Sequence, residues 1–288
     1  MPAKIILIWD YDTPLTTITA TKPYNYSFEA SLQEANDVDT ILRYADDNLL
    51  KFTFAVLGFG AEKSVYPFDV REKIKKIHNH GHEIASHSWK HEWFPHLTKY
   101  QIQKSLERSK KSLEECIDAP GSVIGFVPPH DRPTSWPAKF AFSLDDRALY
   151  PFHPGANIGY LLQELNRQKY GWCRVSYRPF WKKLIDWKGS DFHVRLNKSW
   201  QVSDGVVHFQ GTYSGFDEPL IPLIDIAIKK SYPIVIVGHP AALSRNKTGN
   251  IKYFDSFINY LVTKIKAGDA LTYTVNDYIK TTRLLNNS

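Results

Sequence analysis

Residues 81–91 read Gly81-His82-Glu83-Ile84-Ala85-Ser86-His87-Ser88-Trp89-Lys90-His91, and this stretch is the most informative feature of the chain. Residues 83–86 are typical of a short buried strand, and His87 and His91 follow where that strand ends. Positions four apart on a helical turn share one face, so two imidazoles there can reach one metal ion. In α/β proteins this end of a strand is where ligands bind. The alternative is a pair of surface histidines in a His-rich stretch.

A second apolar strand is followed by two carboxylates. The run at residues 5–9 is typical of a central strand buried on both faces, and Asp10 and Asp12 come at its end. Two histidines and one carboxylate are a usual ligand set for a catalytic Zn²⁺ with an open position for water. The second carboxylate is then free to act as a base on that water. The alternative for such an Asp-x-Asp is turn chemistry or helix capping.

A third apolar strand, at residues 234–237, runs into Gly238 and His239. Three strand ends therefore present groups that can bind a metal ion or transfer a proton. A chance explanation would have to hold at all three strand ends. We therefore predict one functional site built from them.

Helical and strand patterns alternate along the rest of the chain without a linker, which predicts a single α/β domain over residues 1–288. A loop is expected over residues 13–28. Strands are expected at 4–9, 52–57, 83–86, 122–126, 172–177, 205–210, 233–237 and 271–275, and helices at 30–49, 69–79, 99–116, 158–168, 220–230 and 252–266.

These segments together resemble the polysaccharide deacetylase family, also called the NodB-homology family or carbohydrate esterase family 4. That family has an aspartate pair after its first strand, a His-(Ser/Thr)-x-x-x-His segment after its third, and a late hydrophobic strand ending in histidine. Residues 126–130, Phe-Val-Pro-Pro-His, are similar to the family's Phe-Arg-Pro-Pro-Tyr loop. The resemblance spans the chain from residue 5 to about residue 280. It implies a single distorted (β/α)7–8 barrel of the glycoside hydrolase and deacetylase type.

The resemblance also implies a role for each matching residue. Asp10 would be the general base and His239 the general acid. The loop that holds Pro129 and His130 would supply a backbone N–H for the oxyanion. One divalent ion, most simply Zn²⁺, would be bound by Asp12, His87 and His91.

The sequence departs from the family pattern at two places. Its aspartates are separated by one residue, which is similar to the branch that holds allantoinase-like and some unusual peptidoglycan deacetylases. Val127 stands where the family has an arginine that orients the catalytic aspartate. Arg174 and Arg178 are the nearest candidates to replace it. We hypothesise that Arg178 does so, with a solvent-paired Arg178 as the alternative. Trp187 follows Asp186 and resembles an Asp/Trp motif on the family's later strands.

Composition limits the other possibilities. The net charge is +6, but the lysines lie mainly on expected helices with interleaved carboxylates, so we expect solvated helix faces and no nucleic-acid partner. No run of 18 apolar residues is present, so no membrane span is expected. The N-terminal strand carries Asp10 and cannot be a removable signal peptide, and the two cysteines build no disulfide framework. These features predict a cytoplasmic protein, and they leave its oligomeric state open.

The leading prediction is therefore a metal-dependent hydrolase that removes an N-acetyl group from an N-acetylated sugar. A cytoplasmic location favours a nucleotide- or lipid-linked precursor of glycan biosynthesis. Two alternatives stay open. The first is a hydrolase of a small non-sugar amide, as in allantoinase-like relatives. The second is a catalytically inactive, carbohydrate-binding member of the family, for which the valine at position 127 is the best support.

Overall fold

The structure, a computed structural model, describes residues 1–19, 28–94, 97–131, 141–142, 152–153, 158–175, 200–245 and 250–282. Its strands are β1 (Ala3–Tyr11), β2 (Thr53–Val56), β3 (Glu83–Ser86), β4 (Gly125–Phe126), β5 (Ala141–Phe142), β6 (Phe152–His153), β7 (Trp172–Arg174), β8 (Gln201–Ser203), β9 (Val206–Phe209), β10 (Tyr213–Ser214), β11 (Pro233–Gly238) and β12 (Ala270–Tyr273). Its helices are α1 (Thr13–Thr19), α2 (Phe28–Asp47), α3 (Arg71–Asn79), α4 (Lys99–Ile117), α5 (Ile158–Arg167), α8 (Leu220–Lys230), α9 (Ala242–Arg245), α10 (Asn250–Lys266) and α11 (Val275–Thr282), with 3-10 turns η1 (Gly58–Ala61) and η3 (Pro129–Asp131).

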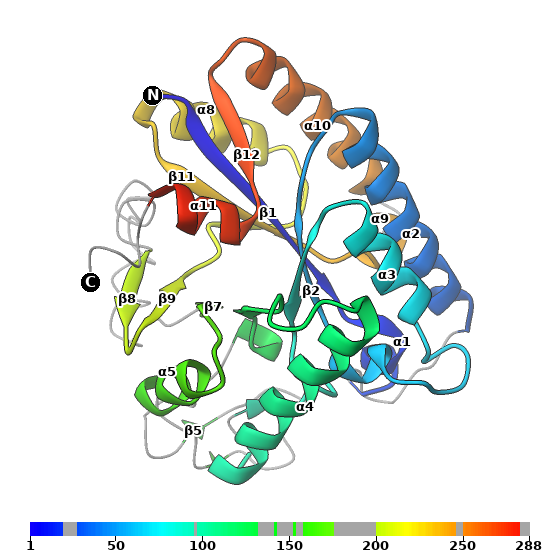
Figure 1. The fold of residues 1–288 in the computed structure, drawn as a ribbon. Helices are drawn as coiled ribbons and strands as arrows, with labels where there is room; N and C mark the ends of the chain where they lie inside the picture. The colour runs from blue at the N-terminus through cyan, green and yellow to red at the C-terminus, as the bar shows by residue number, and fades with distance from the viewer. Residues whose placement is uncertain are drawn as a thin grey trace.

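One curled sheet organises the molecule (Figure 1). Its strands run in the order β10-β11-β1-β2-β3-β4-β7-β9-β8, and β12 pairs with the first half of β1. All neighbours are parallel except β8, which runs antiparallel to β9. Helices α2, α3, α8 and α10 cover one stretch of its outer face, and α4 and α5 cover another. The predicted distorted (β/α) barrel is confirmed.

The strand β1 is buried on both faces, and its side chains alternate between two cores. Ile5, Leu7 and Trp9 pack outward against the helices. Ile6 and Ile8 point into the barrel interior, where they meet residues of β7, β9 and α11. Asp10 continues the inward series, and this alternation is what delivers a carboxylate to the end of the barrel interior.

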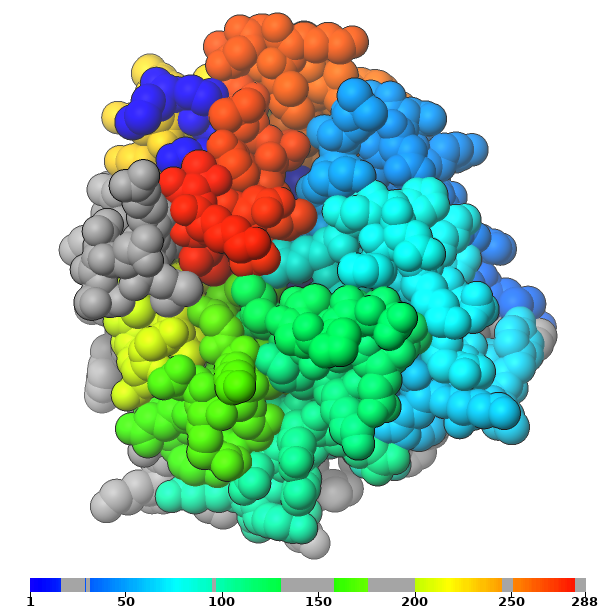
Figure 2. Space-filling model, viewed as in Figure 1, coloured from blue at the N-terminus to red at the C-terminus, as the bar shows by residue number. Residues whose placement is uncertain are grey.

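The helix α11 closes the barrel interior from the other end. Its apolar side chains, Val275 among them, belong to the interior core. The hydroxyl of Thr53 accepts a hydrogen bond from the Val275 N–H at 3.0 Å, and the Glu83 carboxylate accepts from the Asn276 N–H at 3.1 Å. Glu83 also accepts from the indole N–H of Trp172 at 2.9 Å. Figure 2 shows α11, in red, packed between the orange C-terminal segments and the green middle of the chain.

One expectation about secondary structure was wrong, one helix was missed, and one strand is shorter than predicted. The expected loop at 13–28 begins with α1, and the chain continues from β12 into a helix, α11, that we did not predict. The N–H of Asp277 donates to the Thr274 hydroxyl at 3.1 Å, so Thr274 acts as an N-cap that the sequence could have revealed. The strand expected at 122–126 is reduced to residues 125–126. No helix in the described ranges is both long and apolar enough for a membrane span.

His82, the first histidine of the opening stretch, has a structural role. Its side chain is buried, its Nδ1 accepts a hydrogen bond from the Phe52 N–H at 3.1 Å, and its ring stacks on Phe52 with centroids 5.7 Å apart. Burial lowers the pKa of His82 to about 4. The folded protein therefore holds this imidazole neutral.

We predict that His82 makes the fold sensitive to acid. Its pKa in the folded state lies below the ordinary value of about 6.5, so its contribution is complete above pH 6.5 and is lost as the pH falls toward 4. The loss is on the order of 3 kcal/mol of unfolding free energy. Denaturant unfolding of the wild type and of His82→Asn, which keeps an acceptor but does not titrate, measures it. The variant should show the shallower pH dependence, and equal slopes would contradict the assignment.

Candidate functional site

Five strand ends converge on one place at the carboxyl edge of the barrel. Side-chain alternation selects the residues that face the interior there: His87 follows the inward Ala85, and Arg174 follows the inward Trp172. The register places Ser86 opposite Phe126, so the segment after β3 lies beside the segment after β4. On the other side, β11 pairs with β1, which brings His239 next to Asp10.

Three of the predicted residues form a cluster of possible metal ligands. One ligand atom from each of Asp12, His87 and His91 lies within 4.8 Å of the others. The Nε2 atoms of His87 and His91 are 3.3 and 3.6 Å from Oδ1 of Asp12. Both imidazoles are buried, with side chains 2% and 5% exposed, while Asp12 is 23% exposed. Solvent therefore reaches the cluster from the side of Asp12, while the two histidines are shielded from it.

The orientation of His87 shows that the cluster fits a cation. Its Nδ1 lies 2.8 Å from the backbone carbonyl of Val127, which can only accept, so Nδ1 carries a proton. Nε2 then presents a lone pair toward Oδ1 of Asp12, as metal-ligating histidines do. Oδ1 is buried and receives no hydrogen bond of good geometry from the described residues. Two lone pairs at 3.3 Å need a proton or a metal ion between them.

The electrostatics of the three groups agree with this picture. Burial alone would raise the pKa of Asp12, but the contact with His87 and the other imidazoles around this carboxylate hold its pKa well below the ordinary value. Burial also opposes the charged form of His87, yet the carboxylates of Asp12 and Asp10 raise its pKa. Burial lowers the pKa of His91 to about 3, so this imidazole is neutral. Because a metal ligand must offer a lone pair, metal binding would require Nε2 of His87 to be free of a proton.

The two histidines are brought together by a tight loop and not by the helical turn that their spacing suggested. Ser88 and His91 both adopt left-handed backbone conformations, with φ of 69° and 59°. The ring centroids of His87 and His91 are 5.1 Å apart. The spacing therefore grouped two histidines that do lie together, but the local geometry that joins them is a loop and not a helical turn.

Asp10 forms a buried ion pair with Arg174. The guanidinium donates from both terminal nitrogens, at 2.9 Å to Oδ1 and 2.5 Å to Oδ2. The two side chains are 5% and 1% exposed. Burial by itself would raise the pKa of Asp10, but the positive charges of Arg174, His87 and His239 lower it. The carboxylate is therefore ionised and fixed in one rotamer.

The remaining predicted residues border this core. Nε2 of His239 lies 3.8 Å from Oδ2 of Asp10, and its side chain is 44% exposed. His130, with φ of 60°, directly follows Pro129 in η3, and its ring centroid lies 4.6 Å from that of His91. Arg178 and Trp187 lie outside the described residues.

Sequence reasoning missed the positive role of Val127. We considered this position only as one that lacks an arginine, yet its carbonyl orients His87, and its side chain belongs to the interior core. Among the described residues, the guanidinium that contacts Asp10 is that of Arg174, one of the two candidates but not the preferred one.

Comparisons with known proteins bear on the family and the fold. The family model for polysaccharide deacetylases matches residues 20–136, which include His87, His91 and the Pro-Pro loop. No curated protein matches this chain. The predicted resemblance to this family is confirmed.

Solved structures share the fold at low sequence identity. A proposed polysaccharide deacetylase from Mycobacterium smegmatis is 14% identical, with a TM-score of 0.60, over 95% of this chain and 93% of that one. A family 4 carbohydrate esterase from Bacillus anthracis is 11% identical, with a TM-score of 0.50, over 97% of this chain and 83% of that one. A pseudoenzyme of the same family from Bacillus anthracis is 14% identical, with a TM-score of 0.51, over 99% of this chain and 66% of that one. At these identities the likeness establishes the fold alone.

Proposed function

Because residues 20–136 match the polysaccharide deacetylase family and the fold is that of its solved relatives, we propose that this chain is a metal-dependent hydrolase that removes the N-acetyl group from an N-acetylated sugar. One observation carries the proposal. Three convergent ligand atoms, from Asp12, His87 and His91, lie beside a separate, ionised carboxylate, Asp10. This is the set of groups that metal-assisted amide hydrolysis needs.

Asp12, His87 and His91 would hold the ion, most simply Zn²⁺. A divalent ion held there would supply Lewis-acid chemistry, activating a water molecule and polarising the acetyl carbonyl. His87 is already in the tautomer that such binding requires, because its Nδ1 donates to the Val127 carbonyl. The partly exposed side of Asp12 leaves the approach for water and substrate.

Asp10 would take the proton of the attacking water. A general base must be ionised, and its carboxylate must be held in a fixed orientation. The bidentate contact with Arg174 provides both conditions for Asp10. The water oxygen bonds to the acyl carbon, the amide C–N bond breaks, and acetate and a sugar amine are the products. The backbone N–H of His130 is our candidate donor to the oxyanion.

His239 would protonate the leaving amine. An amine leaves poorly unless it is protonated, so the reaction needs an acid on the substrate side. His239 directly follows β11, and its side chain is more exposed than those of Asp12, His87 and His91, which suits a contact with substrate. It also lies close enough to Asp10 for its charge to lower the pKa of that carboxylate.

The finer substrate that we propose is a nucleotide- or lipid-linked sugar precursor in the cytoplasm. Cys116 and Cys173 are both buried and form no disulfide, which suits a reducing compartment. The alternative of an inactive, carbohydrate-binding protein rested on Val127 in place of the family's arginine. The contact between Arg174 and Asp10 supplies the missing charge and favours the active enzyme.

Acetate release tests the proposal. Protein loaded with Zn²⁺ should release acetate and an equal amount of free amine from at least one member of a panel of UDP-N-acetyl sugars. Chelation of the metal should stop the reaction. Hydrolysis of small amides such as ureides, without acetate release from any sugar, would support the allantoinase-like alternative instead. Sugar binding with no hydrolysis of either class would indicate the inactive alternative.

A further inference from the structure

Trp89 lies between the two candidate metal ligands His87 and His91 in the chain, but its side chain is directed away from them. Its indole N–H donates to Oε1 of Glu62 at 2.9 Å. The guanidinium carbon of Arg108 lies 3.6 Å from the centroid of the Trp89 ring, and Nζ of Lys90 lies 4.1 Å from it. The indole is therefore anchored to residues that belong neither to the ligand set nor to the base.

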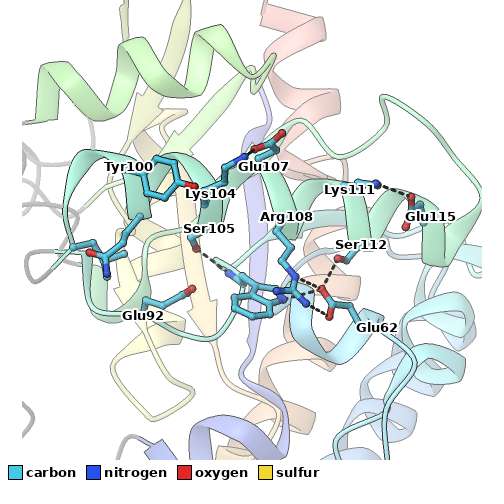
Figure 3. Close-up of a pocket in the computed structure, with 13 residues that line it drawn as sticks. Glu62, Glu92, Tyr100, Lys104, Ser105, Glu107, Arg108, Lys111, Ser112 and Glu115 are labelled. Atoms are coloured by element: carbon cyan, nitrogen blue, oxygen red, sulfur yellow. Dashed lines mark hydrogen bonds and ion pairs between the residues drawn. The ribbon is translucent and has the colours of Figure 1, made fainter.

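Glu62 is the centre of this anchor. Its carboxylate accepts from Nε and from a terminal nitrogen of Arg108, both at 2.8 Å, and from the Ser112 hydroxyl at 2.9 Å. Figure 3 shows Glu62, Arg108 and Ser112 meeting in this way, where η1 faces α4 along a surface groove of about 700 Å³. Because Glu62 also accepts the hydrogen bond from Trp89, its side chain connects α4 to residues 87–91, which we call the ligand loop.

The backbone of the same loop is held from two sides. The Ser88 carbonyl accepts from the Gly58 N–H at 3.0 Å and from the Ser109 hydroxyl at 2.9 Å. The N–H of Trp89 donates to the Ser105 hydroxyl at 3.2 Å. Gly58 is required here, because a Cβ at that position would lie 2.4 Å from the Cα of Ser109. The loop is therefore hydrogen-bonded to the turn η1 on one side and to the helix α4 on the other.

The loop needs such support because its conformation is unfavourable by itself. Ser88 and His91 are non-glycine residues with positive φ, and each costs on the order of 1 kcal/mol or more. Conformations of this kind persist only where surrounding contacts over-determine them. The backbone conformation of His91 is therefore stabilised by the contacts around it, since histidine does not favour positive φ by itself.

We propose that Glu62 is a positioning residue for the metal site. Through Trp89 and Arg108, it sets the conformation of the loop before the ion binds, so the ligands His87 and His91 need no rearrangement. This inference rests on the proposed function, because it assumes that Asp12, His87 and His91 hold a metal ion. None of the contacts of Glu62 given above is with a ligand or with the base. Its effect on the site therefore passes through the loop conformation, and we expect it to appear as a change in metal affinity.

Metal titration of the apoprotein tests the proposal. Glu62→Ala should weaken Zn²⁺ binding about tenfold, the lower end of the loss seen for partners outside the ligand set. Glu62→Gln, which keeps an oxygen for the Trp89 N–H, should recover most of that loss. Trp89→Phe removes one hydrogen bond and should cost roughly fivefold. Visible absorption of the Co²⁺-substituted proteins should change in Glu62→Ala, because the ligand geometry relaxes.

Glu107→Ala is the matched control. Glu107 lines the same groove from α4 and pairs with Lys104 at 2.8 Å, and no contact described here joins it to Trp89. It should bind Zn²⁺ with wild-type affinity. Wild-type affinity and an unchanged Co²⁺ spectrum in Glu62→Ala would overturn the positioning role alone. Absence of metal binding by the wild type would overturn the proposed function, and this inference with it. If Glu62→Ala does not fold, unchanged affinity in Trp89→Phe overturns the role.

Discussion

Replacement of His91 with alanine is expected to remove the metal ion and, with it, the hydrolytic activity. The three ligand atoms of Asp12, His87 and His91 lie within 4.8 Å of one another, and the cluster has no spare ligand of this kind among the described residues. Loss of a ligand should weaken Zn²⁺ binding by more than the roughly 10²-fold upper range for partners outside the ligand set. His87→Ala should have the same effect. Elemental analysis of the purified variants and acetate release measure both losses.

His80→Ala is the matched control for these two variants. His80 comes from the same His-rich stretch, but its imidazole pairs with Asp46 at 2.7 Å at the end of α3, away from the site. This variant should keep about one ion per chain and its activity. If His87→Ala and His91→Ala both keep a full complement of metal, the ligand assignment is wrong.

The second large effect is expected for replacement of the two aspartates, one of which should lower turnover and the other metal binding. Asp10→Asn should keep the ion but lose roughly 10²–10⁴-fold in turnover, the usual value of general-base catalysis. Asp12→Asn should weaken metal binding, because it loses a charged ligand. Metal content and turnover, measured on the same samples, separate the roles. Loss of the ion from Asp10→Asn and its retention in Asp12→Asn would show that the roles are reversed.

Arg174→Met serves as the companion to Asp10→Asn, because it disturbs the same pair without removing the base. Asp10 is buried, and without the guanidinium its pKa should rise. The acidic limb of the pH–rate profile should then move to higher pH. An unchanged limb would exclude Arg174 from the tuning of the base. Unfolding must be monitored in both variants, since breaking a buried ion pair destabilises a fold by about 3–5 kcal/mol.

Local sequence patterns predicted most of the architecture, and the exceptions have physical causes. The strand at 83–86 and the helix from residue 99 agree with expectation, because a buried apolar run and the Thr98–Gln101 capping box are local signals. The helix α11 was missed because its short apolar face, near Val275, looks like the end of a strand. Its position in the barrel interior depends on contacts with Thr53 and Glu83, which no local pattern reveals.

The candidate site shows the same division. Asp12, His87 and His91 could be grouped from the sequence, because parallel strands bring their carboxyl ends to one edge. The partner of Asp10 could not, because it depends on which strand lies across the barrel and on which of its side chains face inward. Arg174 satisfies both conditions, two residues after the inward Trp172. The role of Glu62 could not be predicted from the sequence for a related reason. Its contacts with the loop run through Trp89 and through Arg108 of α4, which are distant from it in the chain.

The central place of β1 has a consequence for how the chain reaches its native state. The strand β1 pairs with β11 and β12, which lie far from it along the chain, as in the register of Ala3 with Ala270. Pairings between such distant segments must first pay the entropy of closing a long loop, which makes folding slow. Until β11 and β12 have paired with it, much of the apolar β1 has unpaired edges, and this segment is open to aggregation. The contact between Asp10, in β1, and His239, which follows β11, therefore forms only when these distant segments have paired.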